Sequence, residues 1–186
     1  LVEYAWDNGI VLLTAAGNKG PKPVSITDPG TCKRVITVGA MEECVTRNKN
    51  RTKRSFSGCG PTKECIVKPE VVAPGCNIVS CNGKNGYTSK SGTSMATPIV
   101  SGVVALCVGC TKMFNGRKVK SGEVKMNDVK FYNNKAGYIN SNKEELNKKI
   151  KKALFETSFD LDKDKNKQGW GLINPKGMVS EFFSNY

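Results

Sequence analysis

The sequence predicts an α/β fold built around a parallel sheet, and three observations predict it. Short apolar runs around Val11, Val35 and Val71 have the character of buried strands in parallel sheets. Stretches with helical periodicity alternate with these runs, which favours the α/β class. A small, polar, glycine-containing loop leads into a helix at Ser94, and the following residues are apolar and small for about four turns.

The elements of the N-terminal half follow from pattern and from stop signals. Residues 1–8 are expected to be the end of a helix, because Asn8-Gly9 is a helix-stop signal. The polar, basic stretch over 42–53 has no periodicity, so we expect a surface loop there. The predicted strands cover 10–16, 34–40 and 68–75.

The second half of the chain continues the same domain, which we take as 1–186. A hairpin is predicted from 77–81 and 86–89, around Asn82-Gly83. A surface insertion is expected at about 111–140, and Pro175 opens a last helix. Between them, 142–157 is an amphipathic helix. Its apolar stripe is Leu146, Ile150, Ala153 and Leu154, and its outer residues are Lys148, Lys149, Lys151 and Lys152.

Charge and composition limit the classes of partner that the protein is expected to have. Lysine and arginine exceed aspartate and glutamate by 29 − 16 = 13 residues. Because the lysines are spread out without interleaved aromatic residues, we expect a solvated basic surface and no nucleic-acid partner. No run of apolar residues is long enough for a membrane span. The location of the protein stays open, with secreted or cell-surface favoured over cytoplasmic.

The eight cysteines do not form a zinc pattern, since Cys107-x-x-Cys110 has neither a second pair nor a histidine. We expect mostly free buried thiols, and a disulfide framework remains an open alternative. The cysteines are Cys32, Cys44, Cys59, Cys65, Cys76, Cys81, Cys107 and Cys110.

Ser94 stands where a tight loop becomes a helix, which suits a nucleophile. The first backbone N–H groups of a helix have no intrahelical partner, and the helix dipole favours a developing negative charge there. Pro98 is compatible with a first-turn position. The alternative is an ordinary capping serine on a core helix. In the same way, Gly17-Asn18 taken alone is a turn after a strand.

A longer string decides between these interpretations. The segment from Gly92 to Pro98, Gly-Thr-Ser-Met-Ala-Thr-Pro, resembles the nucleophile motif of the subtilisin-like serine proteases, the subtilases. Many members carry histidine after this proline, where this chain has Ile99. The resemblance implies a subtilisin-like three-layer fold with a parallel sheet, of which only the C-terminal part is present. Further matching segments are 15–18, 34–40, 54–61, 68–75 and 169–174.

The resemblance also implies roles for individual residues. Ser94 would be the catalytic nucleophile, and Asn18 would donate a hydrogen bond to the oxyanion together with the Ser94 backbone N–H. Ala15, Ala16 and Gly17 would line one wall of the substrate pocket for the residue before the scissile bond. The family carries an aromatic-proline cis peptide at a turn where this chain has Asp28-Pro29, so a cis peptide is expected there.

The chain contains no histidine, although a serine nucleophile of this kind needs a general base. In the family, the catalytic Asp and His lie N-terminal to the segment matched by 15–18. We therefore expect the C-terminal portion of a catalytic domain, inactive alone, which acts on a peptide or protein substrate when the N-terminal part supplies Asp and His. The alternatives are a non-catalytic binding or scaffold module with this fold, and a Ser–Lys pair using Lys90.

A run of oxygen-bearing residues near the C-terminus resembles a calcium loop. It lacks the glycine and the terminal glutamate of an EF-hand, and lysines separate its acidic residues. A charged turn is therefore favoured, no metal ligand is assigned, and calcium remains an open alternative. The run consists of Asp160, Asp162, Asp164 and Asn166.

Overall fold

The fold is organised around a three-stranded parallel sheet, as predicted. The computed structural model describes residues 1–186 apart from 42–54, 84, 114–142 and 185–186. Leu13 pairs with Ile36, and Val38 pairs with Val71, both in parallel register. The strands, in the spatial order β1-β2-β3, are β1 (Leu13–Ala15), β2 (Ile36–Met41) and β3 (Val71–Pro74).

Strand β1 is shorter than the predicted strand over 10–16, because the flanking backbone groups bond elsewhere. The Ile10 N–H donates to the Ala5 carbonyl and closes the first helix. At the other end, the Ala16 carbonyl accepts from the Thr27 N–H. The apolar run was recognisable in the sequence, but these two competing hydrogen bonds were not.

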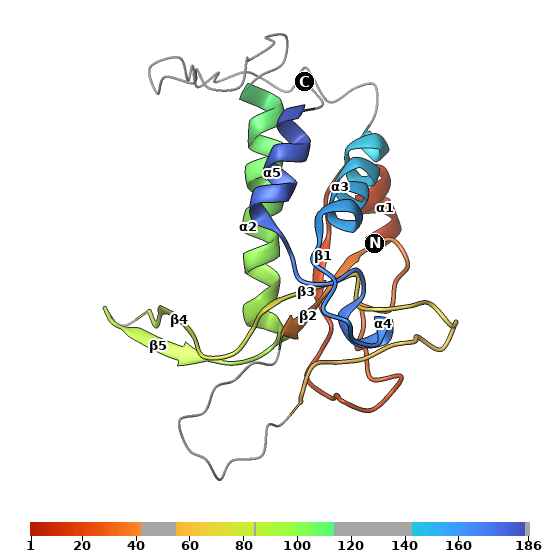
Figure 1. Ribbon diagram of the computed structural model, residues 1–186, viewed down its shortest axis with the longest axis vertical. Coiled ribbons are helices and arrows are strands. Elements are labelled where there is room, and N and C mark those ends of the chain that lie inside the picture. Colours follow the sequence, from red (N-terminus) through yellow and green to blue (C-terminus); the bar gives the residue numbers. More distant parts are fainter. Residues whose placement is uncertain (42–54, 84, 114–142, 185–186) are drawn as a thin grey trace.

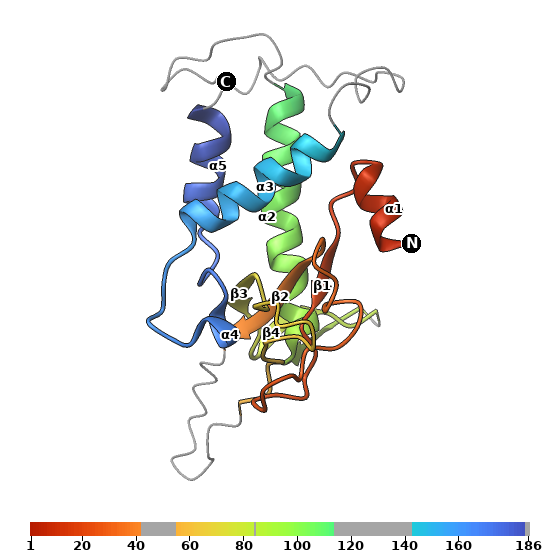
Figure 2. The same ribbon diagram turned by 90° about the vertical axis from the view of Figure 1, so that its right-hand side faces the viewer.

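One long helix, α2, contacts all three strands and packs beside α5 (Figure 1). Figure 2 shows α3 between α5 and α1, which agrees with its contacts to both. None of the described helices is long and apolar enough to cross a membrane. The helices are α1 (Val2–Asp7), α2 (Thr93–Met113), α3 (Lys143–Thr157), α4 (Lys165–Gln168) and α5 (Pro175–Ser184).

A two-stranded hairpin projects from the body of the molecule and leads directly into α2 (Figure 1). It consists of β4 (Ile78–Cys81) and β5 (Tyr87–Lys90), paired antiparallel with Ile78 opposite Lys90. This confirms the predicted hairpin. It also places the last residue of β5 three residues before the start of α2.

The core lies between one face of the sheet and the helices. Alternate residues of β2 are fully or almost fully buried against it, whereas Thr37 faces the other side and donates its hydroxyl to the Gly30 carbonyl at 2.7 Å. In α3 the predicted apolar stripe is confirmed, since Ile150, Ala153 and Leu154 are buried and Leu146 packs against them. The core residues of β2 are Ile36, Val38 and Ala40, and those of α2 include Ala96, Val100, Val103 and Cys107.

The outer edge of β3 is covered by the chain itself. Residues 169–174, one of the segments that resemble the family, run beside this edge. The Trp170 N–H donates to the Glu70 carbonyl at 2.7 Å, and the Val72 N–H donates to the Gly171 carbonyl at 2.9 Å. Gly169 has φ +61°, and a Cβ there would lie 2.1 Å from the Pro69 carbonyl oxygen. Only glycine fits so close an approach in this conformation.

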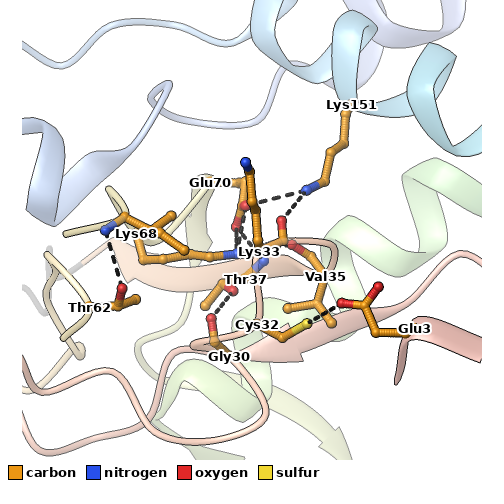
Figure 3. Close-up of polar contacts among 11 residues, drawn as sticks. Glu3, Gly30, Cys32, Lys33, Val35, Thr37, Thr62, Lys68, Glu70 and Lys151 are labelled. Carbon is orange, nitrogen blue, oxygen red and sulfur yellow. Dashed lines mark hydrogen bonds and ion pairs between the residues drawn. The ribbon is translucent and has the colours of Figure 1, made fainter. Parts of the chain in front are cut away.

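A buried ion pair lies in the segment that precedes β3 and is hydrogen-bonded to β2 and the residue before it (Figure 3). The Lys68 Nζ donates to both Glu70 carboxylate oxygens, at 2.7 and 2.9 Å, and to the Val35 carbonyl at 3.1 Å. The Thr37 backbone N–H donates to the same carboxylate at 2.7 Å. Burial lowers the pKa of Lys68, and the charge of Glu70 opposes that effect. The pair is therefore fully hydrogen-bonded, as a buried charge requires.

Helix α3 supplies a second lysine to this cluster (Figure 3). Lys151 donates to the Lys33 carbonyl at 3.0 Å, approaches Glu70 at 3.5 Å, and lies over the Trp6 ring at 5.2 Å. Lys151 was predicted to face outward with the other lysines of this helix, and that prediction is wrong. Amphipathic pattern cannot show that a lysine on the polar side meets a buried carboxylate.

The cysteines differ from the sequence expectation in two respects. Cys76 is disulfide-bonded, not a free thiol. Cys65 and Cys81 are thiols but are exposed, whereas Cys59 and Cys107 are buried as expected. The predicted surface loop over 42–53 lies outside the described residues. So does the predicted insertion over 111–140, apart from 111–113, which continue α2.

Candidate active site

Ser94 lies in the first turn of α2 and is exposed, as its sequence context predicted. The loop before it is held by the Gly92 N–H, which donates to the Gly75 carbonyl at 2.8 Å just after β3. Ser91 accepts a hydrogen bond from the Asn77 N–H at 2.8 Å. The hydroxyl is thus presented by a helix start that is tied to the carboxyl end of the sheet.

Asn18 reaches the same place from β1. Gly17, directly after the strand, has φ +91°, and a Cβ there would lie 2.4 Å from the Thr27 Oγ1 atom. Only glycine makes this turn without strain, and the turn brings Asn18 to the start of α2. The next turn contains Asp28-Pro29, whose peptide is cis, as predicted.

Thr93 joins the two segments. The Asn18 Oδ1 atom accepts hydrogen bonds from the Thr93 N–H and from the Thr93 hydroxyl, both at 3.0 Å. The Thr93 Oγ1 atom accepts in turn from the Gly17 N–H at 3.2 Å. Because the amide oxygen is occupied, the orientation of the Asn18 side chain is fixed, and Nδ2 is left as its remaining donor group.

The Nδ2 group lies beside the loop that precedes Ser94. A Cβ added to Gly92 would be 3.3 Å from Asn18 Nδ2, so a side chain at Gly92 would crowd it. No hydrogen-bond acceptor for Nδ2 is found in the part of the chain that the structure describes. The structure therefore brings Asn18 and Ser94 together through Thr93. Sequence reasoning missed Thr93, although its position between the glycine and the serine of the motif was a signal.

A hollow of about 560 Å³ opens beside Ser94, between β1 and α2. Of the three predicted wall residues, Ala15 lines this hollow. Ala16 is fully buried, and Gly17 is not part of the lining. A substrate-pocket role for these three residues stays a prediction.

A base for Ser94 is not evident among the described residues. The chain has no histidine, and no described residue makes a hydrogen bond to the Ser94 hydroxyl. Lys90, the alternative base, is exposed at the end of β5, and its pairing with Ser94 stays a prediction.

The acidic run near α4 is used in contacts within the protein. The Asp160 carboxylate accepts from Lys165 Nζ at 2.5 Å, from Gln168 Nε2 at 2.7 Å and from the Asp162 N–H at 2.9 Å. These hydrogen bonds, that from Lys165 first, lower the pKa of Asp160 to about 2. Asp164 caps α4. Within the described residues, no group of three candidate side chains is arranged to hold a metal ion.

Comparison with known proteins decides the family. The family model of the subtilases, Peptidase S8, matches residues 1–171. The chain belongs to the subtilase family. The subtilase match spans both segments of the candidate site, and the resemblance carried by 92–98 is therefore confirmed as one of family.

Named subtilases are similar over more than half of the chain. Serine protease AprX of Bacillus subtilis (strain 168) is 44% identical over 120 residues, covering 56% of this chain and 27% of AprX. Subtilisin DY of Bacillus licheniformis is 38% identical over 122 residues, covering 64% of this chain and 40% of that protein. The chain thus spans well under half the length of these relatives.

Solved protease structures share the subtilase fold of this chain. The Patellamide maturation protease PatA superposes with a TM-score of 0.66 at 24% identity, over 98% of this chain and 55% of that chain. The Prenylagaramide maturation protease PagA gives a TM-score of 0.66 at 23% identity, over 97% of this chain and 54% of that chain. At this level of identity the likeness establishes the fold alone.

Proposed function

We propose that this chain carries the nucleophile and the oxyanion-binding groups of a serine endopeptidase, and that the catalytic His and Asp come from residues outside these 186. The observation that carries the proposal is the hydrogen-bonded link from Asn18 through Thr93 to the helix start that bears Ser94. The substrate is a peptide or protein.

In this proposal Ser94 acts as the nucleophile. Its hydroxyl oxygen attacks the carbonyl carbon of the scissile peptide bond while a base takes its proton. The collapse of the tetrahedral intermediate leaves an ester on Ser94 and releases the amine, which receives the proton from the base. Water then hydrolyses the ester by the reverse sequence. The exposed first-turn position of Ser94 leaves its hydroxyl accessible to such a carbonyl.

Asn18 and the Ser94 backbone N–H stabilise the oxyanion. Two Thr93 groups hold the Asn18 amide oxygen, so the Nδ2 donor needs little reorganisation when the charge develops. The helix dipole at the start of α2 acts in the same direction. In subtilisin, another member of this family, loss of one such donor lowers kcat by about 10²–10³.

The general base must come from elsewhere. No residue of this chain is a histidine, and a serine hydroxyl is a poor nucleophile at neutral pH without a base. The chain alone is therefore expected to have no working protease activity. A segment that supplies the base would complete the site.

Hydrolysis of a casein-type substrate by the purified chain tests this proposal. We expect the wild-type chain to release no more peptide than its Ser94→Ala variant. Proteolysis that Ser94→Ala abolishes would show that these residues already contain a base, and Lys90→Met would then identify the alternative Ser–Lys pair. A non-catalytic scaffold module would stay inactive even with a base-bearing segment supplied.

A further inference from the structure

The two segments that meet at the candidate site contain no acidic residue. One is 8–27, which carries Asn18, and the other is 71–109, which carries Ser94. All 16 aspartate and glutamate residues of the chain lie outside them. The same two segments contain no arginine and four lysines, so their side chains carry only positive charge. These lysines are Lys19, Lys22, Lys84 and Lys90.

The acidic residues that border these segments interact within the protein. Two of the three, Asp7 and Glu70, are neutralised by a cation, and Asp28 accepts a hydrogen bond within its own turn. Their partners are Arg34 for Asp7, Lys68 for Glu70 and the Thr31 hydroxyl for Asp28.

The lysines near the site are exposed, and no carboxylate compensates their charge. Lys19, Lys22 and Lys90 are all exposed, and within the described residues none of them is paired with a carboxylate. Several lysines elsewhere differ in this respect. The ion pairs there are Lys149 with Glu145, Lys152 with Glu156, Lys165 with Asp160, and Lys68 and Lys151 with Glu70. The positive charge near the site is therefore available to a ligand.

Two of these lysines lie close to Ser94 along the chain or across it. Lys19 directly follows Asn18, whose Oδ1 atom accepts two hydrogen bonds from Thr93 at 3.0 Å. Lys90 ends β5, four residues before Ser94. Consecutive Cα atoms are about 3.8 Å apart, and a lysine carries its charge on a flexible four-carbon stem. Both ammonium groups can therefore approach side chains of a peptide that is bound at Ser94.

We propose that Lys19 and Lys90 select a substrate with acidic side chains next to the scissile bond. This rests on the proposed function, which places that bond at Ser94. A glutamate or aspartate of the substrate would be attracted by both lysines and would meet no acidic group from either segment. A lysine or arginine would be repelled, and such repulsion contributes to specificity together with attraction of the right partner. The substrate class is an acidic stretch of polypeptide.

Peptide binding to the Ser94→Ala chain tests this selection without chemistry. The probes are three hexapeptides with the same neutral dye, in which a central Ala-Ala is flanked on both sides by two glutamates, two glutamines or two lysines. At low salt we expect the glutamate peptide to bind at least tenfold more tightly than the lysine peptide, with the glutamine peptide between them. The difference should shrink severalfold at about 0.5 M NaCl, because salt screens exposed charges.

Charge reversals separate these two lysines from the overall charge of the chain. Lys19→Glu combined with Lys90→Glu should abolish the preference for the glutamate peptide. Lys63→Glu combined with Lys176→Glu changes the net charge by the same amount at exposed positions outside the two segments, and it should keep most of the preference. Circular dichroism of both double variants checks that the chain still folds.

The outcomes separate substrate selection from the proposed function. Equal binding of the three peptides, or no measurable binding of the glutamate peptide at millimolar concentration, would overturn the proposal. An equal loss in the control double variant would overturn it as well, since overall charge would then account for binding. Selection that depends on Lys19 and Lys90, in a chain that hydrolyses no peptide even with a base-bearing segment supplied, would leave the preference intact and remove the proposed function.

Discussion

The two outer edges of the parallel sheet differ in whether another segment of the chain is hydrogen-bonded to them. At β3 the chain returns, and residues 169–173 cover the edge with hydrogen bonds to Glu70 and Val72. At β1 no described segment pairs, and the neighbouring helix α2 has no charged residue from Thr93 to Gly109 and leaves Ala105 and Leu106 exposed. The β3 edge of the sheet is therefore hydrogen-bonded to another segment, whereas the β1 edge is unpaired within the described residues.

We expect the β3 side to contribute mainly to the stability of the chain and the β1 side mainly to its function. The β3 side holds the buried ion pair, the close glycine approach and the contacts to α3, so substitutions there should unfold the chain. The β1 side holds Asn18 and Ser94, and its exposed groups should tolerate change in the isolated chain.

The largest effect is expected from Glu70→Ala. Lys68 is fully buried, and the substitution leaves its charge without a partner, which typically costs about 3–5 kcal/mol. Urea denaturation measures the loss in the free energy of unfolding. The double variant Lys68→Met with Glu70→Leu should recover most of it, and Glu64→Ala, at an exposed site, should cost almost nothing. A loss below about 1 kcal/mol for Glu70→Ala would contradict the account.

Two glycine substitutions compare the edges directly. Gly169→Ala on the β3 side should destabilise the chain by about 1–3 kcal/mol or more, because of its φ of +61° and the contact with Pro69. Gly102→Ala, in α2 on the open side, meets nothing within 4 Å and should stabilise the chain by about 0.5–1 kcal/mol. Thermal unfolding of both variants measures the contrast, and equal losses would refute it.

Thr93→Val tests the link between the two site segments. It removes the hydrogen bond from the Thr93 hydroxyl to Asn18 and the acceptor for the Gly17 N–H. We expect a loss of about 1–3 kcal/mol in the free energy of unfolding, since Thr93 is buried. Thr93→Ser keeps the hydroxyl and should lose clearly less. If valine and serine behave alike, the hydroxyl does not hold Asn18.

The smallest effect concerns acid stability. The pKa of Asp160 falls from 3.8 to about 2 in the folded chain, so its contribution is complete above pH 3.8 and is lost as the pH falls through about 2. Asp160→Asn should therefore flatten the decline in stability between pH 4 and pH 2. Urea midpoints at several pH values measure the slope. Asp162→Asn, in the same turn, is the matched variant. An equal effect of that variant would contradict the assignment of the acid sensitivity to Asp160.

Much of the fold could be predicted from the sequence because its signals are local. Apolar runs predicted the three parallel strands, and the stripe around Ile150 predicted the buried side of α3. The extent of β1 could not be predicted, because the Ile10 N–H and the Ala16 carbonyl bond to groups chosen by tertiary structure. For the same reason the inward turn of Lys151 and the bonding of Cys76 escaped prediction.

For the site, the motif around Ser94 predicted the helix start and, with Asn18, the pair of segments that meet there. The role of Thr93 needed coordinates, because its partners are 75 and 76 residues away in sequence. The catalytic roles of Asn18 and Ser94 stay predictions.

The central claim is that Ser94 is presented as a nucleophile and lacks only a general base, which must come from outside these 186 residues. The rate at which a fluorophosphonate probe labels Ser94, followed by intact mass, tests it most directly. The account predicts no labelling of the isolated chain above the Ser94→Ala background. It predicts stoichiometric labelling once a segment that supplies the catalytic base is bound, slowed by about 10²–10³ in Asn18→Ala. Rapid stoichiometric labelling of Ser94 in the chain alone would contradict it.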